Sequence, residues 1–204
     1  EYIKAKRANG QEEIGVGFNI TNLGDYETIK FKFIKRFLLR VGANPGSVTK
    51  TGYNTVIMNI KDDIQTEWLG GGYAVWNSRI LLEYPQYPVE AMFSAAEDLI
   101  YSYPIGKKYC LFVCHKARLS ASQTGQSDIS GSNYRAFKST VARLYFCAQH
   151  NEFSGCLYVV TDFILYLFYI LRINYRQWEA FKGFSRGVVY YFRYRDKGQG
   201  ILDD

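Results

Sequence analysis

The sequence predicts an α+β protein in which a small N-terminal β-hairpin precedes a larger, mainly helical and aromatic-rich body. The hairpin is indicated by the turn dipeptide Asn9-Gly10, which joins two short runs within residues 1–24. The helical body is indicated by apolar residues that recur every three or four positions in most later segments. Because 48% of the 204 residues are hydrophobic and 22% are charged, the chain can bury one core. We expect a single domain over residues 1–204, with one candidate subdivision at the Ser/Gly-rich stretch 120–132.

Three helices are expected before residue 104. The first covers 25–40, with Asp25 as its N-cap, although alternation over 28–33 leaves a strand open there. The second starts within 47–51 and ends at Leu69, before three consecutive glycines. A strand can follow over 73–82. The third helix starts at Pro88 and stops before Pro104.

The second half of the chain predicts further helices. Residues 107–116 fit either a strand or a helix. Ser132 caps a helix whose apolar positions include Phe137, Val141, Leu144 and Cys147. Residues 156–194 fit one or two aromatic-rich helices, with strands left open by their Val and Tyr content. The apolar run 156–171 is shorter than the roughly 20 residues that cross a bilayer, so we expect a buried core element and no transmembrane segment.

Composition allows several classes of partner. Aromatic residues make up 17% of the chain, including 18 Tyr and 14 Phe. Tyrosine-rich surfaces are typical of sugar-binding clefts and assembly interfaces, but a core filled with rings accounts for the same count. The net charge of +6 favours polyanionic partners such as nucleic acid, acidic cell wall or anionic membrane. The sequence does not indicate a cellular compartment.

The cysteines do not form a recognisable metal motif. Cys110, Cys114, Cys147 and Cys156 include no CxxC pair, and the chain has only two histidines. We expect free buried thiols, or one or two disulfides, in preference to a zinc site. No cofactor is expected.

The stretch 13–21 is the most informative about function. Its two glycines, Gly15 and Gly17, predict a backbone that lies close to a ligand or to another strand. The run Ile14-Gly15-Val16-Gly17, followed by Phe18-Asn19 and then by helices, resembles the phage-type lysozymes, the muramidases of tailed phages and their pesticin-like relatives. The resemblance covers about residues 12–105. It implies a protein that hydrolyses or binds bacterial cell-wall glycan, with peptidoglycan, a polyanionic glycan, as its partner.

The resemblance also implies site residues, although the catalytic set is incomplete. It places Gly17, Phe18, Asn19 and Thr21 in the substrate cleft. The family has a Glu at the end of a helix before the hairpin, an Asp on the first strand and a Thr ahead of Ile-Gly. Here Arg7 lies where the Asp would fall, and Glu13 takes the Thr position. Glu13 is therefore the first candidate for the catalytic carboxylate and Glu1 the second. A non-catalytic relative remains open.

A non-enzymatic function is the alternative. A basic, tyrosine-rich assembly subunit of a virus or an organelle would show the same surplus of rings, through which it would self-assemble. Such a subunit could also contact nucleic acid, because basic and aromatic residues interleave at 30–40 and again at 190–195.

Overall fold

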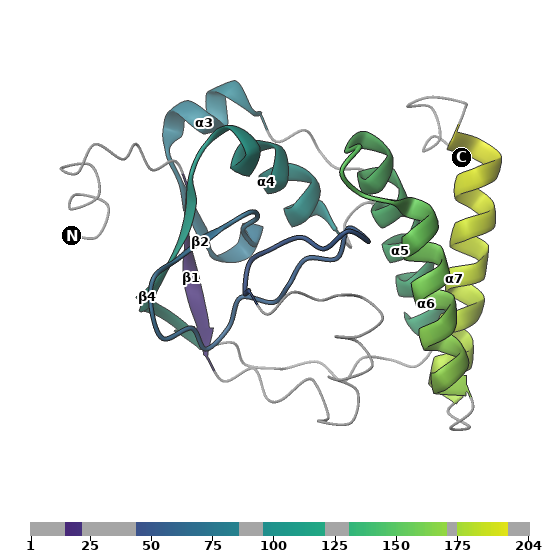
Figure 1. Cartoon of the computed structure of the whole chain (residues 1–204). Helices are drawn as coiled ribbons and strands as arrows, with labels where there is room; N and C mark the ends of the chain where they lie inside the picture. The colour runs from purple at the N-terminus through teal and green to yellow at the C-terminus, as the bar shows by residue number, and fades with distance from the viewer. Residues whose placement is uncertain (1–14, 22–43, 86–95, 121–130, 171–174, 196–204) are drawn as a thin grey trace.

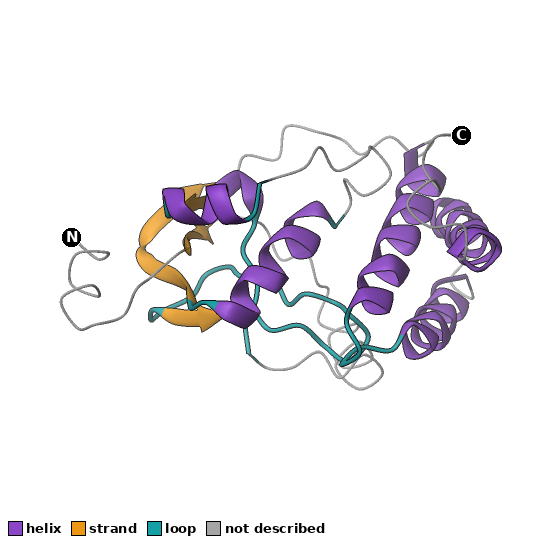
Figure 2. Ribbon diagram, turned by 90° about the horizontal axis from the view of Figure 1, so that it is seen from above, coloured by secondary structure: helices purple, strands orange, loops and turns teal. Residues whose placement is uncertain are grey.

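The computed structural model describes residues 15–21, 44–85, 96–120, 131–170 and 175–195. Within these ranges the α+β class is confirmed: a small sheet lies at one side of the molecule and three long helices at the other (Figure 1). Helix α4 (Glu97–Lys108) lies between the sheet and these long helices (Figure 1 and Figure 2). Of the expected hairpin, only the strand Gly15–Thr21 falls within the described residues, and the expected helix 25–40 lies outside them.

The sheet is mixed and has four strands in the order β2-β4-β1-β3. Strand β1 (Gly15–Thr21) is an inner strand, parallel to β4 (Leu111–Ser120) and antiparallel to β3 (Ala74–Trp76). Strand β2 (Ile64–Thr66) pairs antiparallel with the other side of β4. The twin-glycine strand thus pairs with strands from much later in the chain.

The segment after β2 crosses the sheet and explains the two glycines. Since β2 and β3 occupy opposite edges, residues 67–73 must pass over β4 and β1. Leu69 of this segment lies directly on the glycines: a Cβ on Gly15 would be 2.9 Å from Leu69 Cδ1, and a Cβ on Gly17 would be 2.8 Å from Cδ2. The close backbone approach that the sequence predicts is therefore made to this chain's own crossing segment.

Helix α4 (Glu97–Lys108) covers the crossing segment from the other side. The Leu69 amide donates to Ser102 Oγ at 2.9 Å, and a Cβ on Gly106 would lie 2.5 Å from the Glu67 carbonyl oxygen. The expected stop before Pro104 is wrong, because α4 continues through Pro104 to Lys108. Burial of Leu99, Tyr103 and Ile105 offsets the hydrogen bond that a proline removes.

The expected helix ending at Leu69 is also wrong. Residues 44–63 form an irregular loop in which threonine hydroxyls replace helical hydrogen bonds: Thr55 Oγ1 donates to the carbonyls of Asn44 and Ser47 at 2.9 and 3.0 Å.

The expected strand 73–82 is shorter than predicted. After η1 (Gly71–Tyr73) and β3 the chain enters helix α3 (Ser78–Glu83), whose first turn is capped by the Asn77 side chain.

The helices of the second half are confirmed, but two details are wrong. The helix expected from a Ser132 cap already begins at Gly131, and the run 156–171 is not a buried core element, since Leu157, Val160 and Phe163 are exposed. Helix α5 (Gly131–Gln149) buries Val141, Leu144 and Cys147, and residues 156–194 contain two helices, α6 (Gly155–Ile170) and α7 (Tyr175–Tyr194). The stretch 107–116, which the sequence fits as either strand or helix, contains the end of α4 and the start of β4. Helices α5 and α7 approach closely, since a Cβ on Gly183 would lie 2.0 Å from the Asn133 carbonyl oxygen.

A buried polar network joins the irregular loop to the helices. The Arg143 guanidinium of α5 donates to the Gly52 carbonyl and lies 4.1 Å from the centroid of the Tyr53 ring. The Tyr53 hydroxyl donates to both oxygens of Asp162 in α6, at 2.6 and 2.7 Å. Burial, and then the charge of Asp162, raise the pKa of Tyr53, so the phenol remains a donor.

The cysteines are free thiols, with Cys114 and Cys147 buried and Cys110 and Cys156 exposed. Burial raises the pKa of Cys147 to about 11. In the described part of the chain, no helix is both long enough and apolar enough to span a membrane.

We predict that Gly15→Val destabilises the protein. Valine favours strands by up to ~1 kcal/mol over glycine, but its side chain would collide with Trp76, Leu69 and Leu111. Because overpacking costs about 1–3 kcal/mol, urea denaturation should show a lower free energy of unfolding. Gly72→Val is the matched control, since a Cβ there meets nothing within 4 Å. An unchanged or raised midpoint for Gly15→Val would contradict the close approach.

Candidate functional site

The residues predicted from the glycine motif lie mainly inside the sheet. Gly17 is covered by Leu69, and Asn19 is only 2% exposed. Phe18 and Thr21 are partly exposed, and the Thr21 hydroxyl donates to the Leu119 carbonyl at 3.4 Å. Glu13 and Glu1 lie outside the described residues. The described neighbours of β1 are thus other parts of this chain.

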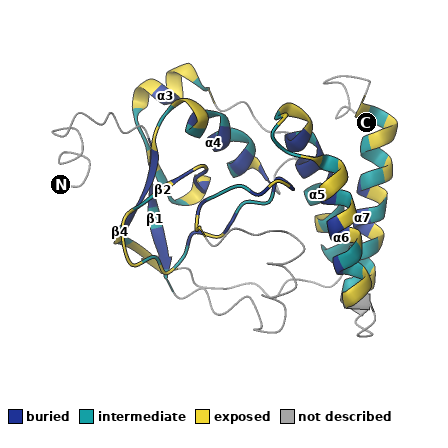
Figure 3. Ribbon diagram, in the orientation of Figure 1, coloured by how far each residue is buried: buried dark blue, intermediate teal, exposed yellow. Residues whose placement is uncertain are grey.

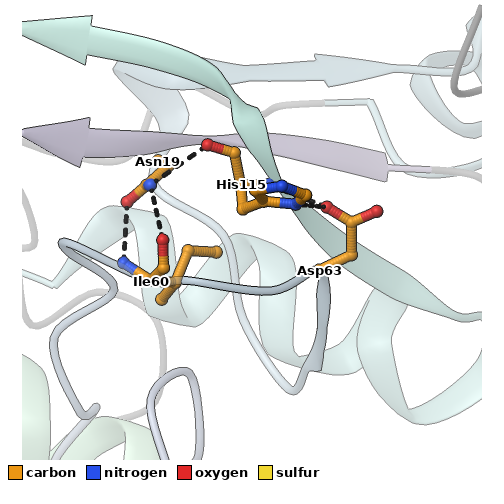
Figure 4. Close-up of polar contacts among 4 residues, drawn as sticks. All are labelled: Asn19, Ile60, Asp63 and His115. Atoms are coloured by element: carbon orange, nitrogen blue, oxygen red, sulfur yellow. Dashed lines mark hydrogen bonds and ion pairs between the residues drawn. The ribbon is translucent and has the colours of Figure 1, made fainter.

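Asn19 fills a break in the sheet (Figure 4). The pairing of β1 with β4 shifts between Phe18, opposite Cys114, and Asn19, opposite Arg118, so residues 115–117 of β4 bulge out. The Asn19 amide nitrogen donates to the carbonyls of Ile60 and His115 at 3.0 and 3.2 Å. Its amide oxygen accepts from the Ile60 N–H at 3.1 Å. The side chain thereby replaces backbone hydrogen bonds that the bulge removes.

The same bulge brings His115 to Asp63. Asp63 Oδ1 accepts from the His115 backbone N–H at 2.9 Å and lies 2.6 Å from the ring Nδ1 (Figure 4). Partial burial raises the pKa of Asp63, but the bonds from His115 outweigh it and hold the pKa below its usual value. An aspartate that orients an imidazole is a familiar catalytic pair, yet within the described ranges no third metal-binding side chain joins it. The pair joins the bulge of β4 to the end of the loop 44–63.

A second polar cluster lies where the crossing segment meets the first turn of α4. We name it the acidic site; it comprises Glu97 and Asp98 with Gly71, Tyr73, Trp76 and Tyr101. The Gly71 amide donates to Asp98 Oδ1 at 2.7 Å, and a Cβ on Gly71 would lie 2.6 Å from the same oxygen. Glycine therefore allows the carboxylate to reach the backbone. Acidic residues are also favoured here by the partial positive charge of the helix N-terminus.

Partly exposed aromatic rings border these carboxylates. Tyr101 follows Glu97 by four residues and Asp98 by three, so it lies beside both acids on the surface of α4. Its ring packs edge-on against Trp76 with centroids 5.6 Å apart, and its hydroxyl donates to the Tyr84 carbonyl at 3.0 Å. Burial, and then the charge of Asp98, raise the pKa of Tyr73, which keeps its phenol protonated. The acidic site thus combines two acceptors, one phenolic donor and apolar ring surfaces.

Comparison with known proteins gives no independent guide. No protein-family model, curated protein or solved structure matches the chain.

The sequence interpretation did not identify the acidic site. Acids in the first turn of a helix are common, and Glu97-Asp98 fell inside the helix expected from Pro88. The available signal is the run Gly70-Gly71-Gly72, from which the sequence predicts a helix stop. A run of three glycines also indicates a backbone that something approaches closely.

We predict that Asp63→Asn destabilises the protein near neutral pH. The pKa of Asp63 is depressed on folding, so its carboxylate stabilises the fold above the unfolded pKa near 4, and this contribution is lost as the pH falls through the folded value. The free energy of unfolding of the variant should be lower by about 1 kcal/mol at pH 7. This is the contribution of a hydrogen bond to a charged group, reduced because the side chain is partly exposed to solvent.

Thermal unfolding at pH 7 and at pH 3 is the measurement. The difference between wild type and Asp63→Asn should be smaller at pH 3 than at pH 7, because protonation of the Asp63 carboxylate as the pH falls removes its advantage. Asp62→Asn, at the exposed neighbouring position, is the control and should change little at either pH. A deficit that is the same at both pH values would contradict an ionic role for Asp63.

Proposed function

We propose that the protein acts on a carbohydrate and that the acidic site holds the sugar. The observation that carries this proposal is the Asp98 carboxylate, fixed by the Gly71 amide and bordered by the partly exposed rings of Tyr73, Trp76 and Tyr101. A carbohydrate ligand is also what the sequence leads us to expect, but the residues differ from Glu13 and Glu1, and the sugar proposed here is neutral where the sequence favours the polyanionic peptidoglycan.

The chemistry of the acidic site suits a sugar. Each sugar hydroxyl can donate and accept a hydrogen bond, and the site offers carboxylate acceptors beside the protonated phenol of Tyr73. Sugar rings also have apolar faces of C–H groups, which pack against aromatic side chains. Because Glu97 and Asp98 are both anionic acceptors, the sugar units bound here should be neutral.

The placement of the carboxylates favours glycosyl transfer over hydrolysis. Hydrolysis of a glycoside needs two carboxyl groups that flank the scissile bond, about 5–9.5 Å apart. Glu97 and Asp98 are adjacent residues in the first turn of α4, so their side chains do not face each other across a scissile bond. One fixed carboxylate is enough to take the proton from an acceptor hydroxyl when the leaving group, such as a phosphate, needs no protonation. We therefore assign Asp98 the role of general base.

Transfer can be measured with chitotetraose as acceptor and a mixture of sugar 1-phosphates and nucleotide-linked hexoses as donors. Mass spectrometry should show a saccharide one unit longer, whereas hydrolysis would give shorter products. Clearing of a peptidoglycan suspension would likewise indicate hydrolysis. Asp98→Asn should slow turnover about 10²–10⁴-fold. The asparagine oxygen can still accept from Gly71, so the fold and sugar binding should persist.

The control variant is Asp62→Asn, the same chemical change at an exposed loop position, which should keep full activity. Binding is followed separately by tryptophan fluorescence, since Trp76 borders the site. The proposal fails if neither donors nor acceptor bind, or if Asp98→Asn turns over as fast as the wild type.

A further inference from the structure

Helix α6 exposes apolar side chains and buries polar ones. Between residues 155 and 168, every exposed residue is apolar: Cys156, Leu157, Val160, Phe163, Leu167 and Phe168. On the inward side Thr161 and Asp162 are only 3% and 6% exposed, and Asp162 accepts the hydrogen bonds from Tyr53. This is the reverse of the usual surface helix, whose polar side faces water.

The apolar surface continues onto α7. The rings of Phe163 and Phe181 lie 6.0 Å apart, and Phe181 stacks on Trp178 at 5.7 Å. Trp178 is 44% exposed, and Val189 and Phe192 follow it on the same side of α7 at helical spacing. We call these exposed residues of α6 and α7 the outer face. Figure 3 shows exposed positions along both helices.

Positive charge is concentrated in the same helices. Residues 155–195, which include α6 and α7, contain six Lys and Arg against two Asp and Glu, an excess of +4 out of the net charge of +6 of the whole chain. Two of these cations flank exposed rings of the outer face. Lys182 Nζ lies 5.8 Å from the centroid of the Trp178 ring, and the Arg195 guanidinium carbon lies 5.3 Å from that of Phe192.

We propose that the outer face docks on the surface of a membrane that contains anionic lipids. Helices that lie in the membrane interface combine an apolar side with Lys and Arg, and tryptophan is enriched at that depth. Anionic headgroups attract each nearby Lys or Arg. A second copy of this chain is a poorer occupant, because two outer faces would bring two strongly positive helical regions together.

Flotation with vesicles tests the proposal, using phosphatidylcholine alone or phosphatidylcholine with phosphatidylglycerol at 3:1. The protein should float with the anionic vesicles, and added salt should weaken this binding. Brominated acyl chains should quench tryptophan emission, and Trp178→Phe should remove most of that quenching. Arg193→Gln with Arg195→Gln should weaken binding about fivefold for each charge removed.

The apolar contribution is tested by the double variant Phe163→Ser with Leu167→Ser, which should lose most binding while circular dichroism stays unchanged. The control is Leu82→Ser, an 84% exposed leucine on α3, which should bind like the wild type. Absence of binding to anionic vesicles overturns the proposal. So does a concentration-dependent dimer that disperses in the double variant, because that result would assign the outer face to a second copy.

Discussion

The structure depends on one steric constraint, the passage of residues 67–70 between β1 and α4. Gly15 and Gly17 leave room below for Leu69, while Gly106 and Ser102 receive the segment from above. The same stretch of chain contributes to both polar clusters, because Asp63 lies just before β2 and Gly71 lies near the end of the crossing segment. The geometry of the β4 bulge and of the acidic site therefore depends on a single stretch of backbone. Side chains larger than glycine on β1 or α4 would push this backbone away from its neighbours.

A second constraint joins the two halves of the molecule. The loop 44–63 reaches from the sheet to the helices, where the carbonyl of Gly52 accepts from Arg143 and Tyr53 donates to Asp162. A buried guanidinium and a buried carboxylate are costly unless both are partnered, and the tyrosine lies against one and bonds the other. This polar junction turns the Asp162 side of α6 inward, which leaves the apolar side of that helix facing out.

The sequence predicted some of this architecture because some signals are local. The helix expected to follow Ser132 and the helices expected within 156–194 have long periodic patterns, and these helices are confirmed. The expected helix ending at Leu69 was wrong because threonine hydroxyls compete for the backbone, and the stop before Pro104 was wrong because burial outweighed a local rule. The acidic site could not be predicted, since Asp98 and the Gly71 amide are 27 residues apart and no local pattern records their contact.

The strand order has a consequence for how the chain reaches this structure. The longest pairing of β1 is with β4, which follows it by roughly a hundred residues, and non-local parallel pairing of this kind is slow to form. During synthesis β1 cannot pair with β4 until β4 has been made. Helices α5, α6 and α7 are contiguous in sequence and can assemble soon after they emerge. The still unpaired strand β1 of the nascent protein is consequently the part that most needs chaperones to protect it.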